Sequence, residues 1–136
     1  ESSSFKIHFY GVNLDGSPGE ELLKKDYLVS VKKGVKKGYF NVMDFNLKMP
    51  KNGIFVGFEK LIIEKNKLEK EVVDSNTKAT AIQKMYFPCV LYNYVERDFI
   101  YTFSGGKWNK QTKLDIANPS DKMRVYEPAI NLILTN

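Results

Sequence analysis

Side chains that carry most catalytic chemistry are scarce in this chain. It has one histidine, His8, and one cysteine, Cys89. A zinc site needs a cluster of cysteine and histidine ligands, and a nucleophilic side chain needs a positioned base. His8 lies on the polar side of an alternating run, which predicts a solvated strand histidine. Cys89 lies in the apolar run 86–91, which predicts a buried, inert thiol. The sequence therefore predicts no metal site and no cofactor.

Carboxylates leave one enzymatic alternative open. A glycosidase places two carboxyl groups about 5–10 Å apart in a cleft. Glu59 is the candidate, since it ends the otherwise apolar segment 54–59, but spacing names no second carboxylate. The other interpretation of Glu59 is a salt bridge with a lysine at a strand end. Asp15, Asp44 and Asp74 fall on expected loops without the spacing of an EF-hand, so no calcium site is predicted.

Aromatic residues carry the remaining functional signal. A flat, exposed Trp or Tyr can stack on the apolar face of a sugar ring while polar neighbours bond its hydroxyls. Trp108 follows Gly105-Gly106, a pair that predicts a hairpin at 104–108. Tyr92 and Tyr94 flank an asparagine. Trp108, Tyr92 and Tyr94 are the candidate ligand-binding platform. The alternative for Trp108 is a place in the core or as a clasp of the hairpin.

The charge pattern argues against nucleic acid as a partner, and the length of the apolar runs argues against a membrane-spanning helix. The net charge is +5, but of 21 basic residues only Arg97 and Arg124 are arginines. Arginine supplies the bidentate contacts of most nucleic-acid readers, whereas scattered lysines keep strand faces and edges soluble. No apolar run approaches the roughly 20 residues of a membrane-spanning helix. We therefore expect neither nucleic-acid binding nor a membrane span, and the oligomeric state stays open.

A period of two dominates the hydrophobic pattern. The alternation, together with frequent Gly, Pro and Asn turns, predicts an all-β, jelly-roll-like sandwich of two antiparallel sheets with about eight strands. It is expected to form a single domain over residues 1–136, with a tail at 1–4 and an exposed excursion at 64–81 that is rich in charges. The expected strands cover residues 5–10, 27–31, 39–42, 54–59, 85–94, 98–103, 123–126 and 130–134.

The stretch DGSPGEELL at 15–23 is predicted to reverse the chain between the first two strands. Its two glycines tolerate positive φ, and Pro18 fixes one hinge. Leu22 and Leu23 are expected to return to the core. The stretch lacks the Gly-Lys-Ser/Thr of a phosphate-binding loop, so it is interpreted as a structural connector.

Five short segments occur in a recognisable order: KIHFY at 6–10, GSPGEELL at 16–23, KGYFNV at 37–42, MPKNGIFVGFE at 49–59 and YTFSGGKW at 101–108. This ordered set resembles the C-terminal β-sandwich of Bacteroidetes envelope proteins that carry a carboxypeptidase-regulatory-like domain. The resemblance implies a jelly-roll-like domain in the periplasm, the outer membrane or at the cell surface. It carries over no catalytic residue, and the export signal would lie outside this sequence.

These observations favour a non-enzymatic accessory or binding domain of an exported bacterial envelope protein, in contact with a glycan or a protein partner. One alternative is a carbohydrate-binding module with its aromatic platform around Trp108. The other is a glycan hydrolase centred on Glu59. The binding hypotheses predict exposed aromatic side chains, whereas the hydrolase predicts two close carboxylates in a pocket, one of them with a raised pKa.

Overall fold

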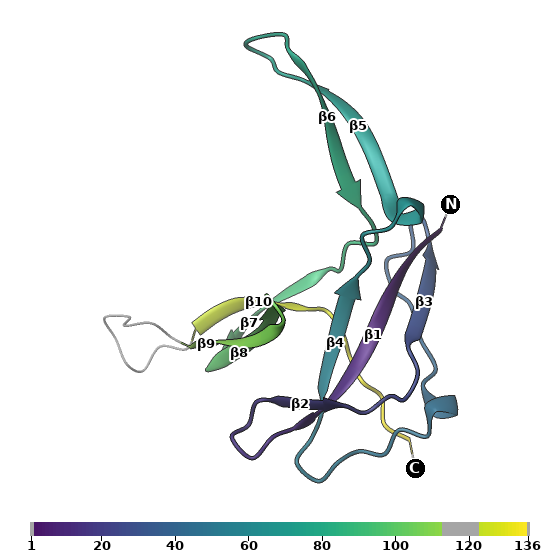
Figure 1. The fold of residues 1–136 in the computed structure, drawn as a ribbon, viewed down its shortest axis with the longest axis vertical. Helices are drawn as coiled ribbons and strands as arrows, with labels where there is room; N and C mark the ends of the chain where they lie inside the picture. Colours follow the sequence, from purple (N-terminus) through teal and green to yellow (C-terminus); the bar gives the residue numbers. More distant parts are fainter. Residues whose placement is uncertain (1, 113–122, 136) are drawn as a thin grey trace. The chain divides into compact units, whose positions relative to one another are not determined.

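The computed structural model describes residues 2–112 and 123–135, and this part of the chain is all-β (Figure 1). The prediction of an all-β fold is confirmed, with strand pairing that is consistent with a β-sandwich. The described residues form ten strands: β1 (Ser2–Val12), β2 (Pro18–Glu21), β3 (Tyr27–Lys32), β4 (Phe55–Lys60), β5 (Lys67–Val73), β6 (Thr80–Tyr86), β7 (Tyr92–Arg97), β8 (Phe99–Ser104), β9 (Lys107–Thr112) and β10 (Met123–Pro128). Two short 3₁₀ turns, η1 (Met43–Phe45) and η2 (Glu64–Asn66), complete the elements.

The chain divides into two compact units, and the single domain expected over residues 1–136 stays a prediction. The first comprises Glu1–His8, Leu23–Lys48 and Gly57–Cys89. The second comprises Phe9–Leu22, Met49–Val56 and Val90–Asn136. Strands β1 and β4 contribute residues to both units.

In the first unit, β1 and β3 pair in antiparallel register from Ser2↔Lys32 to Ile7↔Tyr27. The period of two turns Phe5 and its cross-strand partner Val29 to the same side, and both are buried. The ring of Phe5 stacks on Phe58 of β4, with centroids 4.8 Å apart. Alternation thus sets the register, because a shift by one residue would turn Phe5 and Val29 to solvent.

Residues 2–4 do not form the expected tail. They are the first residues of β1, and Ser3 and Ser4 pair with Val31 and Ser30 of β3. Their small polar side chains resemble a disordered terminus in composition, but the backbone pairing and the burial of Ser4 hold them in the sheet.

Asn66 joins three parts of the first unit. Its side chain is 2% exposed, and its Oδ1 accepts a hydrogen bond of 2.7 Å from the Ser4 N–H. Its Nδ2 donates to the carbonyl oxygens of Ser4 and Leu61, at 2.6 and 2.9 Å. Its own carbonyl accepts from the N–H of Phe87, which follows β6. The side-chain amide of Asn66 therefore connects the start of β1 with the β4–β5 connection, and its backbone carbonyl adds the end of β6.

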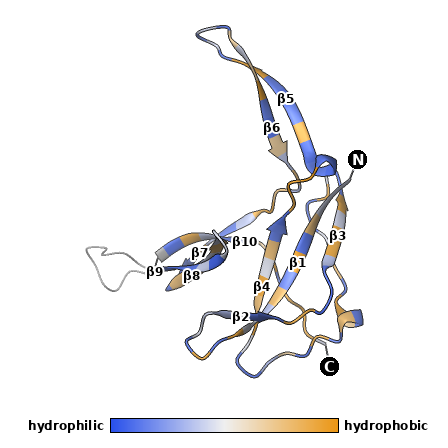
Figure 2. Ribbon diagram, in the orientation of Figure 1, coloured by the Kyte–Doolittle hydropathy of each residue, from blue (hydrophilic) through white to orange (hydrophobic). Residues whose placement is uncertain are grey.

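The predicted excursion at 64–81 consists of η2, β5, a turn and the beginning of β6. β5 and β6 pair over seven residues, from Lys67↔Tyr86 to Val73↔Thr80, and form a hairpin whose side chains are mostly exposed (Figure 1). Hydrophilic and hydrophobic residues are interspersed along it (Figure 2). The charge content indicated solvent exposure correctly, whereas the pairing of β5 with β6 was not predicted from the sequence.

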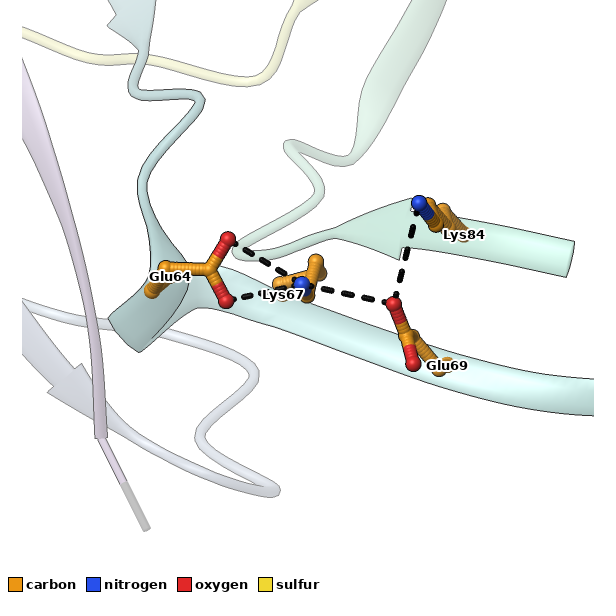
Figure 3. Close-up of polar contacts among 4 residues, drawn as sticks. All are labelled: Glu64, Lys67, Glu69 and Lys84. Carbon is orange, nitrogen blue, oxygen red and sulfur yellow. Dashed lines mark hydrogen bonds and ion pairs between the residues drawn. The ribbon is translucent and has the colours of Figure 1, made fainter.

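One face of this hairpin carries a chain of ion pairs (Figure 3). Lys67 Nζ lies 2.7 Å from Glu64 Oε2 and 3.3 Å from Glu69 Oε1, and Lys84 Nζ lies 3.9 Å from the same Glu69 oxygen. Hydrogen bonds to Glu64 and then to Glu69 raise the pKa of Lys67. The charges of β5 and β6 at this end of the hairpin are therefore directed toward each other.

The stretch at 15–23, which belongs to the second unit up to Leu22 and to the first unit at Leu23, confirms the predicted chain reversal and adds a strand. Gly16 has a φ of +82°, and the Asp15 carboxylate accepts hydrogen bonds from the N–H and the hydroxyl of Ser17. These two bonds lower the pKa of Asp15. β2 then pairs with the end of β1, and Leu23 is buried as expected.

The two other sheets of the second unit are two-stranded. β8 and β9 are joined by Gly105 and Gly106, with φ of +60° and +77°, which confirms the hairpin predicted at 104–108. β7 pairs with β10 in antiparallel register from Tyr92↔Pro128 to Arg97↔Met123. The jelly-roll order of strands stays a prediction.

Two expected strands are wrong, and one is interrupted. At 39–42 the Asn41 carbonyl accepts a hydrogen bond from the Tyr27 hydroxyl instead of from a neighbouring strand. At 130–134 the Ile130 N–H turns back to the carbonyl of Pro128. The strand expected at 85–94 breaks between β6 and β7, where Pro88 has no N–H for a ladder.

We predict that Asn66→Ala destabilises the protein by about 3 kcal/mol, because backbone groups of Ser4 and Leu61 lose buried partners. Urea unfolding measures the effect. Asn76→Ala is the matched control, since Asn76 is an exposed loop residue. Equal stability of the two variants would contradict the role of Asn66.

We also predict that acid loosens the turn of the β5–β6 hairpin. Asp74 Oδ1 accepts hydrogen bonds of 2.8 Å from the N–H groups of Thr77 and Asn76, and these bonds lower the pKa of Asp74 from its ordinary 3.8. The stabilisation is therefore present above that value and is lost as the pH falls through the lower folded pKa. Hydrogen exchange of the two amides measures it. Asp74→Asn keeps an acceptor oxygen and should remove this pH dependence; an unchanged pH profile would contradict the assignment.

Candidate functional site

Three tyrosines share one face of the β7–β10 sheet. Residues opposite each other in an antiparallel pair point to the same side, as do alternate residues along a strand. The pairs Tyr92↔Pro128 and Tyr94↔Tyr126 therefore place three phenol rings and one proline ring together. The exposed fractions of Tyr92, Tyr94 and Tyr126 are 60%, 58% and 68%. We call these four residues the tyrosine face.

Two rings of the tyrosine face lie in contact with each other. The ring centroids of Tyr94 and Tyr126 lie 4.9 Å apart with a tilt of 40°. Next to this pair, Glu96 and Arg124 face each other with 3.8 Å between Oε1 and Nε. The face thus offers the rings and hydroxyl groups of three tyrosines, with one charged pair at its end.

The opposite face of the same two strands carries a valine pair and a salt bridge that join β7 to β10. Val95 and Val125 are paired there and half-buried. The Arg97 guanidinium donates from Nε and Nη2 to the two carboxylate oxygens of Glu127, both at 2.9 Å. Such a bidentate contact fixes the planar orientation of both groups. It ties the two strands together without using any residue of the tyrosine face.

Trp108 lies on a different hairpin from Tyr92 and Tyr94. It is half-buried on β9, opposite Phe103, with ring centroids 5.1 Å apart. The ring of Tyr10 meets it edge-to-face at 5.2 Å. The structure therefore brings Tyr92 and Tyr94 together with Tyr126, and packs Trp108 in an aromatic cluster of its own.

That cluster continues along the same face of β8 and β9. Lys110 Nζ lies 4.5 Å from the ring centroid of Phe99 and 5.9 Å from that of Tyr101. Tyr101 in turn meets Phe55 edge-to-face at 5.7 Å. Phe99, Tyr101 and Trp108 share this face with Lys110 by alternation and register. Here aromatic side chains pack on one another, with Tyr101 and Trp108 half-buried and Phe99 and Phe103 exposed.

Glu59 has a histidine partner where the sequence suggested a lysine. His8 Nε2 lies 2.6 Å from Glu59 Oε2. The His8 side chain is only 15% exposed, so the prediction of a solvated histidine is wrong. His8 is covered because β4 pairs with β1 and brings Glu59 beside it. Nearby, Lys6 Nζ bonds the Asp26 carboxylate at 2.8 Å and lowers its pKa.

Cys89 is exposed, which corrects the prediction of a buried thiol. The run 86–91 leaves the ladder after β6, so its apolar composition does not mark a core strand. Among the described residues, no three His, Cys, Asp or Glu side chains are grouped as metal ligands. Asp15 and Asp74 instead bond the backbone of their own turns.

Comparison with protein-family models, with curated proteins and with solved structures finds no match to this chain. Residues 2–112 and 123–135 contain no helix of the length and apolarity needed to cross a membrane. The resemblance to the envelope β-sandwich therefore stays a prediction.

Sequence patterns alone missed Tyr126 and Pro128. Tyr126 falls within the expected strand 123–126, but which strand pairs with it depends on a contact across about thirty positions of the chain. The available signal was the alternation of Arg124, Tyr126 and Pro128, which predicts a common face without naming its neighbour.

We predict that Trp108→Ala lowers the free energy of unfolding by about 2 kcal/mol, because a half-buried indole leaves a gap beside Tyr10 and Phe103. Tyr94→Ala should cost only about 0.5 kcal/mol, the value of one cross-strand pair. Chemical denaturation compares the two variants. A Trp108→Ala protein as stable as the wild type would contradict its place in the cluster.

Proposed function

We propose that this chain is a non-enzymatic binding module whose tyrosine face stacks on the rings of a glycan. The observation that carries the proposal is the exposure of Tyr92, Tyr94 and Tyr126 beside Pro128 on one sheet face. Exposing three large rings together is costly in water unless a ligand covers them. A strip of phenol rings matches the alternating apolar faces and polar edges of a sugar chain.

The binding mechanism follows from the side chains of the tyrosine face. The rings of Tyr94 and Tyr126 contact the C–H side of successive sugar rings. Their hydroxyl groups, each both a donor and an acceptor, bond the sugar hydroxyls. The Arg124–Glu96 pair at the end of the strip supplies charged partners for further hydroxyls. No step in this mechanism breaks a covalent bond.

The place of such a module would be the bacterial envelope. The resemblance of segments such as 16–23 and 49–59 to an exported β-sandwich supports this location. The module would then hold a larger envelope protein against a glycan surface. The site differs from the platform expected around Trp108, because Trp108 packs with Tyr10 and Phe103.

The proposal predicts selective binding on a glycan array that is lost in Tyr94→Ala and Tyr126→Ala. Loss of one stacking ring should raise Kd about tenfold, which corresponds to about 1.4 kcal/mol. Tyr39→Ala is the matched control, since Tyr39 is an exposed tyrosine of the other unit. Calorimetry with the best array ligand gives the Kd values.

Three results would contradict the proposal. They are the absence of glycan binding by the wild type, equal binding by the tyrosine variants, and release of reducing ends from the bound glycan. The last would favour the hydrolase hypothesis, and a Glu59→Gln variant would then test whether Glu59 carries the reaction.

A further inference from the structure

The β5–β6 hairpin presents strand edges that other chains can join. Within the described residues its sheet has two strands, so each strand has one row of backbone N–H and C=O groups without a ladder partner. A two-stranded hairpin by itself is marginally stable in water, and additional strands with an apolar face stabilise it. Leu68, Val72 and Ile82 of this hairpin are exposed. An added strand would supply hydrogen-bond partners for the free backbone groups and would cover part of the exposed apolar side chains.

The two edges are protected unequally. The sequence of β5, KLEKEVV, has charges at four of its seven positions, and charged side chains are a common protection of free edges. The sequence of β6, TAIQKMY, has only Lys84. Lys84 is directed across the hairpin toward Glu69 of β5 (Figure 3). The edge of β6 is therefore the open one.

β6 is also complementary to itself in an antiparallel register centred on Ile82. That register places Ile82 opposite Ile82 of the second copy, Ala81 opposite Gln83, and Thr80 opposite Lys84. No like charges face each other. By contrast, registers of β5 centred on Glu69, Lys70 or Glu71 each place like charges in opposition, which destabilises a strand pair.

We propose that β6 pairs with β6 of a second copy around a two-fold axis at Ile82, which gives a four-stranded sheet shared by two chains. The contact is isologous, so it closes at two copies instead of growing into a fibre. The shared sheet also extends the hairpin face on which Leu68, Val72, Ala81 and Met85 lie, together with Lys70 and Gln83. The inference is independent of the glycan proposal, because no residue of the tyrosine face takes part.

The first test is the mass of the full chain in solution by light scattering over a range of micromolar concentrations. Ile82→Lys should abolish the dimer, because two lysines would meet at the axis. The hairpin itself should persist, since residue 82 faces Glu71 within it. Val73→Lys on β5 is the matched control with the same added charge and should remain dimeric. A monomeric wild type, a dimeric Ile82→Lys protein or a monomeric Val73→Lys protein would each overturn the proposal.

The second test is disulfide trapping in a Cys89→Ser background, since Cys89 is exposed. Residues opposite each other in a strand pair have Cα atoms about 5 Å apart, within reach of a disulfide. Ile82→Cys should therefore give a covalent dimer on mild oxidation. Glu71→Cys should not, because three strand spacings would separate the two copies of residue 71 by about 14 Å. The reverse pattern, or equal cross-linking of both variants, would overturn the register.

Discussion

The hydrogen bonds between Asn66 and the backbone of Ser4 are the constraint on which the first unit depends. They join residues 62 positions apart in a buried place. A peptide-like amide is the one side chain that can offer an acceptor and two donors to neighbouring backbone groups. With Asn66 in place, the chain entering β5 and the chain leaving β6 are held beside the start of β1. The hairpin can then extend into solvent from a fixed base.

The residues that hold the strands together differ from the residues that form the proposed binding surfaces. The buried apolar side chains are few, namely Phe5, Phe9, Leu23 and Val29 among the described residues. Bidentate and buried polar contacts, at Arg97–Glu127 and at Asn66, hold strands together where apolar cover is thin. The two surfaces proposed for a ligand and a partner, the tyrosine face and the edge of β6, take no part in these polar contacts. Because few apolar side chains are buried, many large apolar side chains of the described residues remain exposed.

Local features were predictable from the sequence, and features that depend on distant pairing were not. The Gly105-Gly106 turn and the reversal at 15–19 follow from backbone preferences of glycine and proline, which act over a few residues. The prediction of a strand at 39–42 was wrong, since the Asn41 carbonyl accepts a hydrogen bond from the Tyr27 hydroxyl and has no strand partner. The His8–Glu59 contact spans 51 positions, and the Tyr94–Tyr126 pair depends on the register of β7 with β10. Periodicity assigns a residue to a face, but only pairing decides which residues share it.

The most direct test of the account is an NMR titration of the wild-type chain with a glycan selected on an array, following the aromatic ring resonances. The account predicts shifts of the ring protons of Tyr92, Tyr94 and Tyr126 that saturate together, with the Trp108 indole unchanged. Shifts centred on His8 and the surroundings of Glu59, or on Trp108 with the tyrosine face silent, would contradict the assignment of the site.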